Sequence, residues 1–575
     1  MTNNLTAIIL DYNKGFKWIT KGNIHIKGYF GGGCPKMKNQ KDCHAICSAK
    51  KDYFAPNLAS SENSKSILGR SGGGIDSATL CSFEEFVAFV EQLYGCFSIV
   101  VEKDDSVWIA VDNARSLPLF YDAGGMIVSD KAENVAKYLG NKEIDIAQYG
   151  LMLASRNTAP GHTVYAGVNQ LEAGTAAEIK EGRVSITRWY RHYGIKKAST
   201  YEELKEAFSY HSAKMIERIL PSLVGKRVVL PLSGGYDSRF LACLLKESGY
   251  KDVVCYTYGI EESFEVQNSK RVAQELGYEW HFVEYNRSGW ETFFDENNGG
   301  RKEYFDNTNN HCNLPHIQDY IALETLLEKK IIVPGDVVIP GFCGDVPAGS
   351  FSNVKAQLEY SNRTLIDYIL SEQCINCELK KEVLNEIRNY LLEYFAENEI
   401  NVRNRDEFIQ AYEEWIILGR LSMWVVNSVR VYEHFGLEWR LPMWDKGYLN
   451  FWYSVPNELR ENCRLYVDLL FEGVFSQFNV ALKKPNTPKT HSTPLRSWIG
   501  TLARRMLVYL SVHLNKDYYK RNNLNDYNEA ALILYSMIKS KAAFNYDSLS
   551  VHRMEEIWWC ESMYGADLLL STINN

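Results

Sequence analysis

The sequence predicts an α/β protein in two parts, a β-rich first part and a later part built on a parallel sheet. The first 190 or so residues hold short β-branched and aromatic runs bounded by turn residues, which are typical of strands. From about residue 200, strand-like runs alternate with helical patterns, which indicates a parallel sheet. After residue 355 the pattern is nearly all helical, and 575 residues are too many for one core.

We place the first part at residues 1–195. Its expected strands are Leu5–Leu10, Ile24–Phe30, Cys96–Glu102, Val107–Asp112 and Val184–Tyr190. Two helices interrupt them. One starts at Ser82, where Ser-Phe-Glu-Glu has the pattern of a capping box, and the other covers Asp130–Leu139.

We place the second part at residues 200–575. Thr200 and Glu203 form a second capping box that starts a helix at 201–219. Glycine ends two of the later helices, at Gly249 and Gly277. The expected strands are 227–232, 252–258, 280–284 and 336–340, and the helices between them are 238–247, 263–276 and 317–329.

Composition excludes several classes of protein. Hydrophobic residues make up 46% and charged residues 23%, which is an ordinary globular balance. The net charge of −8 argues against a nucleic-acid partner. No apolar run reaches the ~18 residues of a membrane span, and no basic stretch precedes a signal-like segment, so we expect no membrane partner and a cytoplasmic protein. The 13 scattered cysteines are then expected to be reduced.

Two glycine loops have the letters of a phosphate-binding loop, Ser71–Ser77 (SGGGIDS) and Ser233–Ser238 (SGGYDS). Such a loop needs a buried strand before it and a helix N-terminus after it. The second loop follows the strand-like KRVVLPL and precedes RFLACLLKES, whereas the first follows a polar stretch. We therefore predict that Ser233–Ser238 binds phosphate and that the first loop is a surface connection.

The chain lacks the Walker pattern G-x-x-x-x-G-K-[ST], so no P-loop lysine reaches the terminal phosphates. This favours a site that holds the pyrophosphate portion of ATP, with cleavage between the α and β phosphates.

Several motifs together resemble one known family. PLSGGYDSRFL resembles the pyrophosphate loop of N-type ATP pyrophosphatases, and the surrounding chain resembles the asparagine synthetase family over roughly residues 200–490. VVIPGFCGDVPAGSF resembles the second glycine-rich loop of that family, with Gly341, Asp345 and Gly349 in register. WRLPMWD resembles its Arg-x-Pro-Phe-Leu-Asp motif, from Arg440 to Asp445. The resemblance implies an ATP pyrophosphatase domain with a helical C-terminal extension.

The first part is similar to the amidotransferase domain of the same family, through the stretch from LYGCFSIVVE to LPLFYD. That resemblance implies an N-terminal-nucleophile fold, two sheets packed between helices (αββα). The family's nucleophile is a cysteine directly after Met1, but here that position is Thr2. The segments that hold glutamine in the family have no clear counterpart. We therefore expect a degenerate amidotransferase domain, although an N-terminal threonine can act as a nucleophile.

The resemblance implies a set of ligand-binding residues. Backbone and hydroxyl donors to pyrophosphate are expected from Ser233, Gly234, Gly235 and Ser238. Asp237 and Asp345 are expected to bind Mg²⁺, which prefers carboxylate and phosphate oxygens. The residues expected to flank the adenosine of ATP are Leu232, Thr257 and Gly341.

The expected catalytic residues are Arg440, Arg464 and Glu265. The family places a lysine downstream of the arginine–proline motif, and Arg464 is nearest to it in register; arginine keeps the charge but cannot act as a base. Lys483, Lys484 and Lys489 follow and are alternatives. Glu265 can also lie on a solvated face, and Arg440–Asp445 can be a structural ion pair.

The resemblance implies an ATP-dependent carbon–nitrogen ligase that adenylates a carboxylate and passes it to an amine. The acceptor is then aspartate or a sugar acid of surface polysaccharides, and the nitrogen comes from ammonia, a substrate amine or a separate glutaminase. The other candidate partner is a second copy of the chain, in a homodimer. Three alternatives remain: an intramolecular amide cyclase of the macrolactam or β-lactam type, a non-catalytic nucleotide-binding pseudoenzyme, and a thiolating relative that uses Cys343.

Overall fold

A computed structural model describes residues 7–9, 19–21, 24–30, 81–482, 506–516, 527–540 and 551–574, with gaps at 104, 141, 355–356, 358, 512 and 515. The loop Ser71–Ser77, Thr2, Lys483, Lys484 and Lys489 lie outside the described residues. Within the described ranges, no helix has both the length and the apolar character that a membrane span requires.

The first part contains two sheets. One is antiparallel, in the order β10-β9-β5-β4-β3-β2, and the other has the order β1-β7-β6-β8 with β1 parallel to β7. The strands of the first sheet are β2 (Ile19–Lys21), β3 (Ile24–Phe30), β4 (Gly95–Glu102), β5 (Ser106–Val111), β9 (Thr175–Lys180) and β10 (Arg183–Arg188). Those of the second are β1 (Ala7–Ile9), β6 (Phe120–Asp122), β7 (Ile127–Ser129) and β8 (Val168–Gln170).

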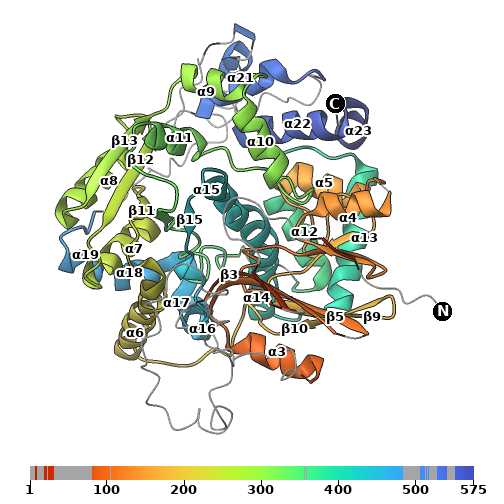
Figure 1. Cartoon of the computed structure of the whole chain (residues 1–575), viewed down its shortest axis with the longest axis horizontal. Coiled ribbons are helices and arrows are strands. Elements are labelled where there is room, and N and C mark those ends of the chain that lie inside the picture. The colour runs from red at the N-terminus through yellow and green to blue at the C-terminus, as the bar shows by residue number, and fades with distance from the viewer. Residues whose placement is uncertain are drawn as a thin grey trace.

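The two sheets pack face to face with helices on their outer sides. Alternate residues of β5, such as Val107 and Ile109, join Tyr121 and Val128 of the second sheet in one buried cluster. Helix α3 (Phe83–Gln92) covers the outer face of the larger sheet, and α4 (Ala132–Leu139) covers that of the smaller one. A further helix, α5 (Ile146–Ser155), packs against the C-terminal helices (Figure 1). The layers are therefore helix, sheet, sheet and helix.

The second part is built on a five-stranded sheet in which every neighbouring pair is parallel, in the order β13-β12-β11-β14-β15. Its strands are β11 (Val228–Pro231), β12 (Val253–Gly259), β13 (Glu279–Glu284), β14 (Val337–Val338) and β15 (Glu438–Trp439). The connecting helices are α6 (Tyr201–Ile219), α7 (Tyr236–Glu247), α8 (Phe264–Leu276), α9 (Arg287–Phe294), α10 (Gly299–Thr308) and α11 (Tyr320–Glu328). Figure 1 shows α7 and α8 beside this sheet.

The C-terminal part is helical apart from β15 among the described residues. Its longer helices are α12 (Asn362–Gln373), α13 (Lys381–Glu397), α14 (Arg405–Ile416), α16 (Lys446–Ser454), α18 (Arg464–Glu472), α21 (Tyr527–Met537), α22 (Val551–Tyr564) and α23 (Ala566–Thr572). A π-helix, η2 (Ile417–Val425), continues α14. Short helical segments complete this part: η3 (Val426–Val429), α15 (Arg430–His434), η4 (Pro442–Trp444), α17 (Asn457–Arg460), η5 (Glu461–Cys463) and α19 (Val474–Gln477). A further one, η1 (Leu220–Leu223), lies between α6 and β11.

The mixed α/β class and the parallel sheet are confirmed, while the domain boundaries at 195 and 200 stay predictions. The capping box at Thr200 is present in full, because Thr200 and Glu203 bond to each other's backbone N–H. The box at Ser82 is incomplete: Ser82 accepts from the N–H of Glu85, but the Glu85 side chain accepts from Cys81. Helix α7 begins at Tyr236, two residues earlier than expected, and the two-residue strand β15 was not expected.

Candidate nucleotide site at the switch point of the parallel sheet

The order of the parallel sheet reverses between β11 and β14. From β11 the chain proceeds outward through β12 to β13, and it then returns to place β14 on the other side of β11. In sheets of this kind ligands bind in the crevice beyond the carboxyl ends of the two strands at the reversal. Ser233–Ser238 leaves β11 at this edge, and the loop from Gly341 to Gly349 leaves β14 beside it.

The first of these loops is held by its own serines. The hydroxyl of Ser238 accepts from the backbone N–H of Ser233 at 3.1 Å, and the hydroxyl of Ser233 accepts from the N–H of Gly235 at 3.1 Å. The two hydroxyl oxygens are themselves 3.1 Å apart. Gly235 is the N-cap of α7 and makes no side-chain capping bond, so the positive end of the helix faces the crevice without a capping oxygen of its own.

Asp237, in the first turn of α7, joins the two loops. One carboxylate oxygen accepts from the N–H groups of Gly344 and Asp345, at 2.9 and 3.3 Å. The other accepts from the hydroxyl of Tyr466 at 2.9 Å. Burial, and next the negative charge of Asp345, raise the pKa of Asp237 to about 7. The structure therefore brings the two predicted Mg²⁺ ligands together.

Three glycines allow the segments to approach this closely. A Cβ on Gly341 would lie 2.6 Å from the backbone nitrogen of Ser238, and one on Gly234 would lie 2.8 Å from the Cα of Glu265. On Gly344 it would meet the carboxyl carbon of Asp237 at 3.0 Å. Real Cβ contacts below 3.0 Å are not tolerated, so any side chain at Gly341 or Gly234 would push the two loops or α8 apart. Glu265 lies next to the first loop, as expected.

Two residues that the sequence did not single out support the first loop. Arg239 is fully buried, and its guanidinium donates to the carbonyl of Gly234 at 3.1 Å and to those of Val480 and Leu482. Tyr466 projects from α18 to Asp237. The arginine directly after SGGYDS was a detectable signal, but Tyr466 is 229 residues from Asp237 and had none in the sequence.

Leu232 and Thr257 lie behind the loop and are buried, at 1% and 5% exposure. The Thr257 hydroxyl donates to the carbonyl of Leu232 at 2.6 Å, and the indole N–H of Trp280 donates to it at 3.0 Å. This hydroxyl therefore ties β11 to β12. Gly341 lies at the crevice, and the expectation that Leu232, Thr257 and Gly341 flank an adenosine stays a prediction.

The two predicted catalytic cations differ in their contacts. The guanidinium of Arg440 turns back from the crevice and bonds to Ser222, the carbonyl of Trp439 and the carboxylate of Glu438. The alternative of a structural ion pair is met by a different partner: Arg440 pairs with Glu438 at 3.0 Å, whereas Asp445 pairs with Arg218 at 2.7 Å and caps α16. The Arg464 side chain is 84% exposed, with Asp468 4.0 Å away.

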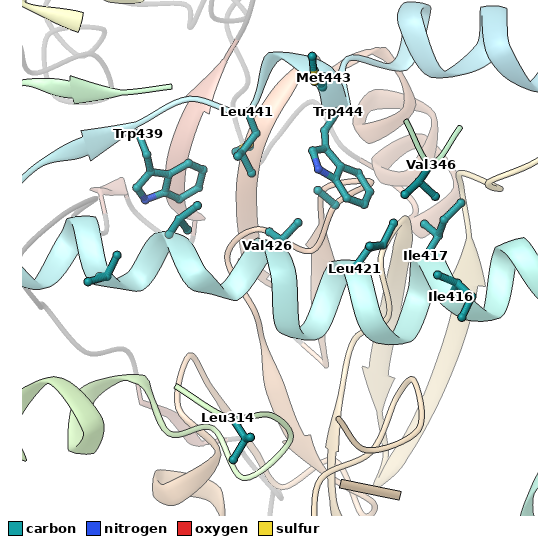
Figure 2. Close-up of a cluster of buried hydrophobic side chains, with 14 of the residues drawn as sticks. Leu314, Val346, Ile416, Ile417, Leu421, Val426, Trp439, Leu441, Met443 and Trp444 are labelled. Carbon is teal, nitrogen blue, oxygen red and sulfur yellow. The ribbon is translucent and has the colours of Figure 1, made fainter. Parts of the chain in front are cut away.

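The π-helix η2 lies under the motif that contains Arg440. Figure 2 shows Leu421 and Val426 directed toward Leu441 and Trp444, with Val346 of the second loop nearby. Because η2 and the second loop share one buried cluster, the position of the loop depends on this helix.

The donor set of the crevice fits a magnesium–nucleotide complex. Two carboxylates lie close enough for Asp345 to raise the pKa of Asp237, and a divalent cation would relieve that repulsion. Among the described residues, no group of three or more histidine, cysteine, aspartate or glutamate side chains is arranged to hold a metal ion. Mg²⁺ commonly takes one or two carboxylates and completes its shell with phosphates and water.

The fold and this crevice define a parallel-sheet protein in which two glycine-rich loops meet at the switch point. Residues 225–310, from the start of β11 to the end of α10, match the family model described as asparagine synthase. No curated protein matches the chain.

Two solved structures are similar at low identity. One is the allosteric regulatory enzyme of purine biosynthesis, at 13% identity over 46% of this chain and 61% of its own, with a TM-score of 0.16. The other is glutamine phosphoribosylpyrophosphate amidotransferase from B. subtilis complexed with ADP and GMP, at 11% identity over 57% and 58%, with a TM-score of 0.14. The chain thus spans about three fifths of each, and neither likeness carries an argument about function.

Proposed function

We propose that this protein is an ATP-dependent carbon–nitrogen ligase of the asparagine synthase type, which adenylates a carboxylate and transfers it to an amine. The single observation that carries the proposal is the contact of Asp237 with the second loop at the sheet's switch point. Asp237 itself lies inside the segment that matches the family model. In the reaction a carboxylate oxygen attacks the α-phosphorus of ATP, pyrophosphate leaves, and the amine then displaces AMP.

The residues of the first loop bind the leaving pyrophosphate in this proposal. Ser233, Gly234, Gly235 and Ser238 offer backbone N–H groups and hydroxyls, and the start of α7 adds its positive end. Asp237 and Asp345 hold the cation. Magnesium, when bound, would neutralise charge on the departing pyrophosphate. Gly341 allows the second loop to pack directly against the start of α7.

The exposed guanidinium of Arg464 is better suited than Arg440 to stabilise transition-state charge. Arg440 is already bonded to four acceptors in a buried setting, whereas Arg464 begins α18, the helix that sends Tyr466 to Asp237. Glu265, beside Gly234, is placed to orient the loop or an amine.

The first part is proposed to be a degenerate amidotransferase domain with an N-terminal-nucleophile-like fold, and its two packed sheets support this. The nitrogen then comes as ammonia or as a substrate amine. The thiolating alternative is disfavoured, because burial and the nearby Asp345 raise the pKa of Cys343 well above its usual value, and a thiolating cysteine needs a thiolate.

The test is release of pyrophosphate and AMP from ATP and Mg²⁺ with a panel of acids, namely aspartate, uronic acids and short peptides. Each acid is combined with ammonia or glutamine. We expect one combination to release both products and Asp237→Ala to abolish release. Equal products from wild type and Asp237→Ala, or none from any combination, would reject the ligase. Turnover with glutamine alone would show that the first part retains glutaminase activity.

A further inference from the structure

Two arginines from distant parts of the chain lie over one tryptophan ring. The guanidinium carbon of Arg156 is 4.8 Å from the ring centroid of Trp424, and that of Arg420 is 5.9 Å from it. Arg156 is the C-cap of α5 in the first part, whereas Arg420 and Trp424 belong to η2. A Cβ on Gly419 would lie 3.1 Å from the side-chain amide nitrogen of Asn157, so the two segments touch. We name these three residues the arginine–tryptophan cluster.

Both guanidiniums have few hydrogen-bond partners. Arg420 is half-buried and makes no hydrogen bond or ion pair with the part of the chain that the structure describes. The Nε of Arg156 is buried without a partner there, and its Nη2 reaches only the side-chain oxygen of Asn376, at 3.4 Å. Arginine offers five donors, so the cluster has unused donors on two cations.

The acids nearest to Arg156 do not balance its charge at neutral pH. They are Glu555 and Glu556 of α22, and both are buried. Burial raises the pKa of Glu555 to about 8 and that of Glu556 well above its usual value, which weakens their ability to neutralise Arg156. The charge of Arg420 also acts to lower the pKa of Arg156, which means that two cations are held near each other.

The cluster adjoins the nucleotide crevice. Burial lowers the pKa of Arg420, and the carboxylate of Asp345 in the second loop is close enough for its charge to act in the opposite direction. Arg156 has a φ of +76° and Cys343 one of +72°, a region that favours glycine, so both positions keep a side chain at a conformational cost. The π-helical form of η2 is itself uncommon and occurs often at functional sites.

Resting on the proposed ligase function, we propose that the arginine–tryptophan cluster binds a second anionic group of the carboxylate substrate, the group that is not activated. The reacting carboxylate loses its charge when its oxygen bonds to phosphorus, so it does not need two lasting cations. A group that stays anionic through adenylation and transfer to the amine needs lasting cations beside it. The substrate class is therefore an acid with a second negative group, either an amino dicarboxylate or a phosphorylated uronic acid. In this assignment the first part contributes Arg156 to substrate selection.

The test compares acids that differ only in the second group. L-Aspartate is paired with β-alanine, which lacks the second carboxylate. Galacturonic acid 1-phosphate is paired with methyl galacturonoside, which lacks the phosphate, so the two pairs show whether the second group is a carboxylate or a phosphate. Pyrophosphate release is measured with wild type, Arg156→Gln, Arg420→Gln and the control Arg301→Gln, which removes another buried arginine stacked on a tryptophan, Trp558.

We expect wild type and Arg301→Gln to have a KM at least about tenfold lower for one dianion than for the matched acid that lacks the second group. Both cluster variants should lose this difference, while their KM for ATP stays within about twofold of the wild-type value. No preference in wild type, or a raised KM for ATP in place of the acid, would overturn the assignment. If no acid releases pyrophosphate, the ligase proposal fails by itself. Calorimetric titration of the same acids then tests the cluster directly. Binding of a dianion to wild type that is weaker in both cluster variants supports the proposed site, and no binding of either dianion rejects it.

Discussion

The carboxylate of Asp237 accepts a hydrogen bond from the backbone N–H of Asp345, 108 residues further along the chain, at 3.3 Å. The two side chains carry the same charge, and their proximity contributes to raising the pKa of Asp237 to about 7. The arrangement favours a cation between them and is unfavourable to folding without one.

Asp237→Asn should raise the stability of the ligand-free protein and abolish its activity. The asparagine oxygen can accept from Gly344 and Asp345, and its NH₂ can donate to the Tyr466 hydroxyl oxygen, so the contacts survive without the charge. The pKa of Asp237 is raised on folding, so the wild type loses stability as pH rises from about 4 to about 7. At pH 8 we expect a melting temperature higher by about 1–3 °C and pyrophosphate release lower by at least about 100-fold. A lower melting temperature would contradict this.

Magnesium should bind more tightly as pH rises. Protons compete for Asp237, whose pKa lies near 7 without the cation, so the apparent affinity should be about tenfold weaker at pH 6 than at pH 8. Titration of Mg²⁺ in the presence of a non-hydrolysable ATP analogue would measure it. Asp345→Asn removes the second cause of the shift, and its affinity should be weaker overall with a flatter pH dependence. If the Mg²⁺ affinity of wild type and of Asp345→Asn changes equally with pH, the charge of Asp345 is not the cause of the pH dependence.

Gly341→Ala should separate the two loops. Its Cβ would lie 2.6 Å from the nitrogen of Ser238, and backbone atoms cannot yield as a flexible side chain can. We expect a loss of about 1–3 kcal/mol in the free energy of unfolding and a larger relative loss in ATP affinity. Gly299→Ala is the matched control, because no atom lies within 4 Å of a Cβ at that position. Similar effects of the two substitutions would argue against a close approach at Gly341.

Tyr466→Phe tests the hydroxyl that reaches Asp237 from α18. The hydroxyl donates to the carboxylate and so favours its charged form; without it the pKa of Asp237 should rise further. The acidic limb of the pH profile for pyrophosphate release should shift upward by about half a unit to one unit. Tyr210→Phe, at an exposed tyrosine on α6, should leave the profile unchanged. A uniform loss of rate with the same profile would mean that Tyr466 acts through packing alone.

The sequence was sufficient for features that depend on local patterns. The run VVLP followed by SGGYDS gave both the strand β11 and the loop, because a buried strand and a glycine turn are read from adjacent residues. The pairing of Asp237 with Asp345 followed from the resemblance, since each lies directly after a strand that ends at the same edge of the sheet.

Features that depend on distant packing were not predictable. Strand β15 has only two residues, too few for a periodic pattern, and it exists because the edge of β14 pairs with it. Arg440 follows that strand, and nothing in its own neighbourhood shows that Ser222 would bind its guanidinium. Arg156 and Arg420 are 264 positions apart, so only the fold brings them to Trp424.

Arg440 and Arg464 should respond differently to substitution. Arg440→Gln removes donors from Ser222, Trp439 and Glu438 in a buried setting, so we expect a loss of about 2–3 kcal/mol in the free energy of unfolding. Arg464→Ala removes an exposed side chain and should change stability by less than about 0.5 kcal/mol. If Arg464 stabilises the transition state, its variant should lose kcat by at least about tenfold at unchanged KM for ATP, as steady-state pyrophosphate release would show. The opposite result would be full activity of Arg464→Ala together with a folded but inactive Arg440→Gln. It would assign transition-state stabilisation to Arg440, because an arginine that only stabilises the fold cannot lower kcat in protein that remains folded.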